Sequence, residues 1–270
     1  MEKINLNDIN FSSLQKLKTQ GTQSTIYTDG NICYKIVDGL YPSEKRELYE
    51  KFIAMDGIKI DNVILPKDLI VKNGKLEGYT MDYFKDSMPL SDKFEKRYFN
   101  CKDLFNYVVK ASATLRDIHN NGIICQDLSF ENLLVNDNGE IVFCDMDGCS
   151  YGRFNSPFCS IVLKNFLVDY RKSHLHIKKD IDKLSMILSF YLIVYGEVLQ
   201  KITKKQYHIL SDNIHTLENL RHLANILVNK DFRIENLPYL DEYIDITDDY
   251  EIDREKVLNF KQKLNIFFNK

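Results

Sequence analysis

Short apolar runs joined by tight turns fill the first third of the chain, and helical periodicity follows. Runs of β-forming residues flank Asp29-Gly30, and a second pair of runs flanks Asn73-Gly74. These dipeptides between β-forming runs are the strongest short-range signal of a β-hairpin. Between the two hairpins, apolar residues recur at helical spacing, which predicts a helix over residues 43–55.

Beyond residue 81 the pattern changes from strands to helices. Residues 103–120 carry one apolar face, and residues 180–195 are apolar almost all round, as in a helix buried inside a domain. A third hairpin signal is Asn138-Gly139. Weaker helical patterns cover residues 204–212, 217–228 and 254–268.

We therefore expect an α+β fold in a single domain spanning residues 1–270. Residues 1–81 form a small antiparallel β-sheet lobe with one helix, and residues 82–270 form a larger, mainly helical lobe. The sequence shows no internal repeat.

Composition and charge narrow the class of protein. Of 270 residues, 36 are Lys or Arg and 39 are Asp or Glu, a net charge of −3 that argues against a nucleic-acid-binding surface. The longest apolar run is too short for a membrane span, which needs about 20 residues. The chain starts without a secretory signal, and its 6 cysteines form no C-x-x-C pair. We expect a cytoplasmic protein with no membrane span and no nucleic-acid partner.

Hairpin geometry predicts where polar side chains meet. A two-residue turn at Asn138-Gly139 places Asn132 opposite Asp145, and Asp127 precedes Asn132 by five residues. Two carboxylates and a carboxamide at one hairpin end suit Mg²⁺.

A second polar cluster is expected at the first hairpin. A two-residue turn at Asp29-Gly30 places Lys35 opposite Ser24, with the polar segment 21–25 over its ammonium group. Backbone N–H groups, hydroxyls and a lysine at that position could hold phosphates.

These residues, in this order, resemble the protein-kinase superfamily over residues 15–200. In that family a Gly-rich loop precedes a strand lysine, an H-R-D-x-x-x-x-N loop and a D-F-G segment. The corresponding residues here are Lys35, the 125–132 segment Cys-Gln-Asp-Leu-Ser-Phe-Glu-Asn, and Asp145-Met146-Asp147. The 180–185 segment resembles the start of the buried helix whose aspartate braces the catalytic loop.

The resemblance implies a bilobal kinase-like fold, with ATP and Mg²⁺ as cofactors and a role for each matching residue. Asp127 accepts the proton of the attacking hydroxyl, and Lys35 steadies the ATP phosphates. Asn132 and Asp145 hold Mg²⁺. The remaining expected nucleotide contacts are Gly21 and Ser24 of the loop over the phosphates, Met81 as gatekeeper, and the backbones of Asp82 and Phe84 around adenine.

Two roles stay open at this stage. The resemblance implies a helix glutamate paired with Lys35, for which Glu47 is the expected residue and Glu44 and Glu50 are alternatives. Asp147 stands where glycine is usual and adds a possible third carboxylate at the metal.

The implied activity is transfer of the ATP γ-phosphoryl group to a protein serine or threonine. The sequence departs from the family pattern, since only Gly21 remains of the Gly-rich loop, Gln126 replaces the loop arginine, and no A-P-E segment follows. Two alternatives therefore stay open. One is a small-molecule kinase of the aminoglycoside or choline type, and the other is a pseudokinase that binds nucleotide as a scaffold.

Two further segments have simpler interpretations. His119, at the end of the 103–120 helix, is expected to cap the helix or to lie in the core. The acidic stretch 241–255 is expected to be a solvated loop, with a docking surface for a basic partner as the alternative.

Overall fold

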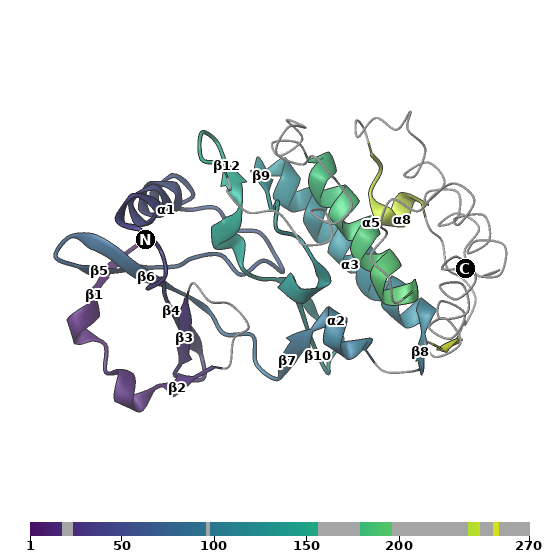
Figure 1. Cartoon of the computed structure of the whole chain (residues 1–270), viewed down its shortest axis with the longest axis horizontal. Helices are drawn as coiled ribbons and strands as arrows, with labels where there is room; N and C mark the ends of the chain where they lie inside the picture. Colours follow the sequence, from purple (N-terminus) through teal and green to yellow (C-terminus); the bar gives the residue numbers. More distant parts are fainter. Residues whose placement is uncertain (18–23, 96–97, 156–178, 196–236, 244–250, 254–270) are drawn as a thin grey trace, which may run out of the picture.

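The computed structural model describes residues 1–17, 24–95, 98–155, 179–195, 237–243 and 251–253. The helices expected over residues 204–212, 217–228 and 254–268 lie outside the described residues. Within them the fold is α+β, as predicted, with a mixed six-stranded sheet and several helices. Figure 1 shows the sheet with α1 at one end of the molecule, and the helices α3 and α5 towards the other.

The sheet is mixed rather than antiparallel. Its order is β1-β5-β6-β4-β3-β2, and the edge strand β1 runs parallel to β5, whereas the other neighbours pair antiparallel. The strands are β1 (Lys3–Asn5), β2 (Gln15–Lys16), β3 (Thr25–Thr28), β4 (Ile32–Ile36), β5 (Leu69–Lys72) and β6 (Lys75–Asp82). Strands β1 and β2 are too short to show a period of two in the sequence, so the hydrophobic pattern did not reveal them.

The second hairpin confirms its predicted turn. Lys72 lies opposite Lys75, so Asn73 and Gly74 are the two turn residues. Both have positive φ (50° and 75°), the conformation that a type I′ turn requires and that asparagine and glycine adopt most readily.

The first hairpin turns one residue later than predicted. The Asp29 N–H donates to Ile32 O, so the turn residues are Gly30 and Asn31. Lys35 consequently lies opposite Ile26 rather than Ser24. The turn shift moves every cross-strand pair by two residues, so the faces of the strands are unchanged.

Helix α1 (Pro42–Ala54) covers the sheet close to the predicted range. It buries Leu48 and Phe52, and the Phe52 ring packs edge-on against Tyr79 of β6 with ring centroids 4.9 Å apart. These residues form a small hydrophobic core that is separate from the larger core of the helical part.

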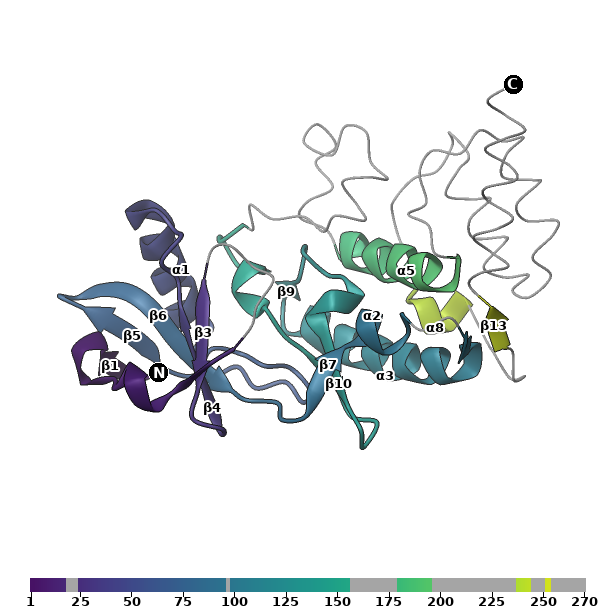
Figure 2. The same cartoon turned by 60° about the horizontal axis from the view of Figure 1, so that its bottom comes forward.

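The larger core forms around α3 (Cys101–Asn120) and α5 (Asp180–Tyr195), as the periodicity predicts. Figure 2 shows α5 lying along α3, with the short helix α8 at their side. The remaining helices are η1 (Leu6–Asp8), η2 (Phe11–Ser13), α2 (Leu90–Lys93), η3 (Phe130–Asn132), η4 (Met146–Gly148) and α8 (Leu240–Tyr243). The remaining strands are β7 (Ser87–Pro89), β8 (Tyr98–Asn100), β9 (Ile123–Ile124), β10 (Leu133–Asn136), β11 (Ile141–Phe143), β12 (Ser150–Tyr151) and β13 (Glu251–Asp253).

Two expectations about surface and membrane can be compared with this fold. No helix in the described part of the chain combines the length and the apolar character that crossing a membrane requires. The acidic stretch 241–255 is not simply a loop, because it contributes α8 and β13 at its described ends.

Candidate functional site

A buried carboxylate at the start of α5 holds the loop between β9 and β10, here called the 125–132 loop. Asp182 is fully buried, and its two oxygens accept the backbone N–H groups of Cys125 and Gln126, each at 2.7 Å. Its Oδ2 also lies 3.0 Å from Nε2 of His119. Hydrogen bonds to a buried carboxylate are strong, so the backbone of this loop is fixed from the helical core.

The 125–132 loop turns sharply directly before Asp127. Gln126 is fully buried and has a φ of 60°, which long side chains rarely adopt. Asn132 closes the loop, since its Nδ2 donates to the backbone oxygen of Asp127 at 2.7 Å. The structure therefore brings Asp127 and Asn132 together.

The predicted partner of Asn132 is off by one residue. Gly139 N–H donates to Asn136 O, which makes a three-residue turn instead of the two-residue turn expected. Leu133 then pairs with Phe143, and the Cys144 N–H donates to Asn132 O at 3.0 Å. Asn132 lies opposite Cys144, so Asp145 is the next residue along the chain rather than the cross-strand partner.

Lys35 of β4 meets two carboxylates from the segment that follows β11, here called the 145–149 segment. Its Nζ forms an ion pair with Asp145 and lies 2.9 Å from Oδ2 of Asp147. The Lys35 side chain is only 7% exposed, whereas the side chains of Asp147 and Asp145 are 16% and 46% exposed. Asp147 is thus the buried partner, and Asp145 is the carboxylate that solvent reaches.

The pKa values follow from this three-charge arrangement. Burial by itself lowers the pKa of Lys35, but Tyr79 and the two carboxylates outweigh it and raise that pKa well above the usual value. Partial burial and the charge of Asp147 raise the pKa of Asp145 to about 6, against the effect of Lys35. Burial would raise the pKa of Asp147, but Lys35 is close enough to lower it. Lys35 and Asp147 therefore form the stable charged pair of the site.

The expected pairing of Glu47 with Lys35 does not occur in this structure. Glu47 is exposed on α1, and the Lys35 ammonium is occupied by Asp145 and Asp147. The alternatives are engaged elsewhere, because Glu44 accepts from the Tyr41 N–H at the helix start and Glu50 pairs with Arg46. The carboxylate comes from the 145–149 segment instead of the helix.

The residues expected around ATP lie along β6 and beside β3. The Tyr83 N–H donates to Asn31 O, so the backbone groups of Tyr83 face the first hairpin. Backbone N–H and C=O groups alternate in direction along an extended chain, so those of the preceding residue, Asp82, point away from β4. The Phe84 carbonyl accepts from Ser87 Oγ at 2.7 Å. Met81 is half-buried in β6, and Ser24 is half-buried just before β3. Gly21 lies outside the described residues.

The donor set fits a magnesium ion that arrives with phosphates. In the described ranges, no three His, Cys, Asp or Glu side chains gather in a way that could hold a metal ion. The expected set is smaller, since it has a single carboxylate, that of Asp145, and adds the Asn132 carboxamide. Mg²⁺ prefers oxygen ligands and commonly takes one or two carboxylates together with substrate phosphates.

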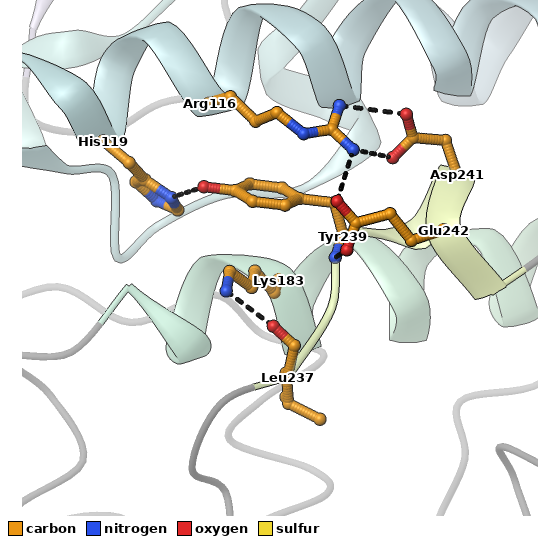
Figure 3. Close-up of polar contacts among 7 residues, drawn as sticks. All are labelled: Arg116, His119, Lys183, Leu237, Tyr239, Asp241 and Glu242. Atoms are coloured by element: carbon orange, nitrogen blue, oxygen red, sulfur yellow. Dashed lines mark hydrogen bonds and ion pairs between the residues drawn. The ribbon is translucent and has the colours of Figure 1, made fainter.

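A second polar cluster supports the brace from behind. Tyr239 Oη lies 2.9 Å from Nδ1 of His119, and the Tyr239 ring lies between the guanidinium of Arg116 and the ammonium of Lys183, at 4.4 and 4.6 Å from the ring centroid (Figure 3). Arg116 in turn holds Asp241 of α8 through two hydrogen bonds of 2.7 and 2.9 Å. His119 is buried, which confirms the core alternative for this residue.

Two residues with clear roles in this arrangement were missed from the sequence. Lys51 of α1 is buried and bonds to the 145–149 segment, but nothing in its sequence pattern distinguishes it from the exposed charges of the same helix. Tyr239 follows a long stretch without a clear motif. The role of Asp182 was predicted in part. An aspartate of the 180–185 segment was expected to brace the loop, but the sequence did not distinguish Asp180 from Asp182.

Comparison with known proteins adds no family to this geometry. No family model matches the chain, and no curated protein matches it either. Any function must therefore be argued from the motifs and from the contacts described above.

Proposed function

We propose that the chain is an ATP- and Mg²⁺-dependent phosphotransferase of the protein-kinase kind, which transfers the γ-phosphoryl group to a protein serine or threonine. The observation that carries the proposal is the meeting of Lys35, from the sheet, with Asp145 beside a loop braced by Asp182. Phosphoryl transfer depends mainly on positioning and charge neutralisation around a loose transition state. A lysine, carboxylates and a carboxamide on fixed backbone are suited to that chemistry.

Each residue has one task in this proposal. Asp127 accepts the proton of the attacking hydroxyl, and Lys35 contacts the ATP phosphates. Asn132 and Asp145 hold Mg²⁺, which neutralises phosphate charge when it is bound. Asp147 keeps the Lys35 ammonium in place, and the half-exposed Asp145 is the carboxylate within reach of a ligand.

Backbone strain supports the same location. Five non-glycine residues of the described chain have positive φ, and four of them are asparagine or aspartate, which tolerate it best. Gln126 is the exception, and Asp145 is the aspartate that begins the 145–149 segment. Residues held in sparsely populated conformations cluster at functional sites, where the surrounding structure enforces them.

The test of transfer is the intact mass of the purified protein after incubation with Mg-ATP. We expect a phosphoryl-sized gain in the wild type and no gain in Asp127→Asn, which lacks the proton acceptor. Asp137→Asn, a matched change at an exposed turn residue, should gain mass like the wild type. Equal gains in all three proteins would contradict the role of Asp127.

The test of binding separates the alternatives. Mg-ATP at about 100 times its Kd should stabilise the wild type and Asp127→Asn by about 2.7 kcal/mol, and Asp145→Asn by less. Absence of any stabilisation in the wild type would overturn the proposal. Stabilisation by Mg-ATP without a mass gain would show that the chain binds the nucleotide but does not phosphorylate itself. A screen of small hydroxyl compounds for ATP consumption then distinguishes a small-molecule kinase from a scaffold.

A further inference from the structure

Helix α1 places a buried ammonium group against the candidate site. Lys51 is only 5% exposed, and its Nζ donates to the backbone oxygens of Asp147 at 2.6 Å and Cys149 at 2.8 Å. A buried charge is costly unless it is fully hydrogen-bonded, so these two carbonyls are what makes the position tolerable. The bonds join α1 to the 145–149 segment at the middle residue of the short helix η4 and at the residue that directly follows it.

The position of Lys51 explains why no helix glutamate reaches Lys35. Glu47 and Lys51 are one helical turn apart and share a face of α1, but Glu47 is exposed and Lys51 is the residue that enters the site. Relative to the arrangement expected from the sequence, the cation and the carboxylate have changed places between α1 and the 145–149 segment. The helix supplies the cation, and the loop supplies Asp147 as the carboxylate for Lys35.

We propose that Lys51 is a positioning residue, which fixes the 145–149 backbone so that Asp147 stays on Lys35 and Asp145 remains at the solvent-facing edge. The proposal rests on the proposed function for the tasks of Lys35 and Asp145. It does not depend on that function for the geometric claim, which is that Lys51 immobilises the segment.

Lys45 provides a matched control on the same helix. It is also a largely buried lysine, and its Nζ pairs with Glu77 of β6 at 2.6 Å. Its partner is a side chain of the sheet and not the 145–149 segment. Loss of a buried lysine contact in α1 can therefore be separated from loss of the contact to the site.

The experiment measures amide hydrogen exchange and steady-state kinetics in Lys51→Met, Lys51→Arg and Lys45→Met. The Cys149 amide bonds to Met146 O and reports on the segment. In Lys51→Met we expect its exchange to accelerate roughly ten- to a hundredfold, the loss expected for charge-assisted hydrogen bonds. We also expect kcat to fall about tenfold or more, with KM for Mg-ATP changing less than about threefold.

The other variants decide between positioning and mere packing. Lys51→Arg keeps the charge and N–H donors, so it should retain more of kcat and of Cys149 protection than Lys51→Met does. Lys45→Met should change both by less than about twofold. Unchanged Cys149 exchange in folded Lys51→Met, or equal effects in Lys45→Met, would overturn the proposal.

Two further outcomes are also decisive. If the wild type transfers no phosphoryl group, the proposed function fails, and Cys149 exchange alone still decides whether Lys51 fixes the segment. If Lys51→Met does not fold, Lys51→Gln is measured in its place. It keeps an N–H donor on a shorter chain, and faster Cys149 exchange with protection elsewhere retained supports the proposal, whereas wild-type exchange overturns it.

Discussion

Replacing Asp182 by asparagine removes the charge that holds the 125–132 loop. The carboxylate is fully buried and accepts the N–H groups of Cys125 and Gln126, each at 2.7 Å. Asparagine has nearly the same size but one acceptor oxygen, so one backbone N–H faces an amide NH₂ and stays unpaired. A hydrogen bond to a charged group contributes about 1.5–3 kcal/mol, and an orphaned buried donor costs about 1–3 kcal/mol. We therefore expect Asp182→Asn to lower the free energy of unfolding by roughly 3–5 kcal/mol.

Urea unfolding followed by circular dichroism measures this loss, with Asp180→Asn as the control on the same helix. The Asp180 carboxylate accepts the Leu237 N–H at 2.9 Å, a bond that an asparagine oxygen keeps, and its pairing with Lys183 is long, at 3.6 Å. The control should lose clearly less than Asp182→Asn, because it keeps the bond to Leu237 and leaves no backbone N–H unpaired there. If both variants lose the same amount, the bonds to Asp182 do not stabilise the fold as argued, and the brace is only a contact.

Two further changes test the sheet and the α8 contact. In a thermal melt, Gly78→Ala should lower the free energy of unfolding by about 1–3 kcal/mol, because a Cβ there would lie 2.3 Å from the Lys35 carbonyl oxygen and displace β4. The control Gly57→Ala has open space around it and a φ of 85°, so it should lower that free energy by only the conformational cost of about 1 kcal/mol. The bond to Arg116 lowers the pKa of Glu242 below its ordinary 4.5, so Glu242 stabilises the folded state above that pH and loses its effect as the pH falls through the folded pKa. The stability difference between wild type and Glu242→Gln should be constant from pH 7 to about 5 and shrink towards pH 3, and a difference that grows on acidification contradicts this assignment.

The elements were predictable where the information is local. Helices α3 and α5 follow from apolar periodicity, and the Asn73-Gly74 turn follows from the positive φ that those two residues accept. The sheet was less predictable, since the short edge strand β1 pairs in parallel with β5, where Lys3 lies opposite Leu69. The adjoining bond from the Glu2 N–H to the Asp68 carboxylate spans 66 residues. Pairing at such separation is set by the packed fold and leaves no periodic signal in three residues.

Register errors had a common physical cause. In the first and third hairpins the glycine was correctly predicted to lie in the turn, but its position within the turn was not. Gly30 is the first residue of its two-residue turn, not the second. Gly139 occupies the position after a type I turn, not the second position of a two-residue turn, which moves Asn132 from Asp145 to Cys144. A glycine signals positive φ, but it does not say which turn residue carries it.

The ion pairs and charged hydrogen bonds across the site could not be predicted from the spacing of residues in the sequence. Lys51 and Asp147 are 96 residues apart, and Lys35 and Asp147 are 112 apart, so each contact depends on how the sheet and the helical part pack. Glu47 and Lys51 are one helical turn apart on the same face of α1, and helical spacing alone does not determine which of the two is buried. Lys51 is the buried residue of that face, and its charge helps Lys35 to lower the pKa of Asp147. The Asp147 carboxylate and the Lys51 ammonium are therefore two parts of one electrostatic arrangement, although 96 residues separate them in the sequence.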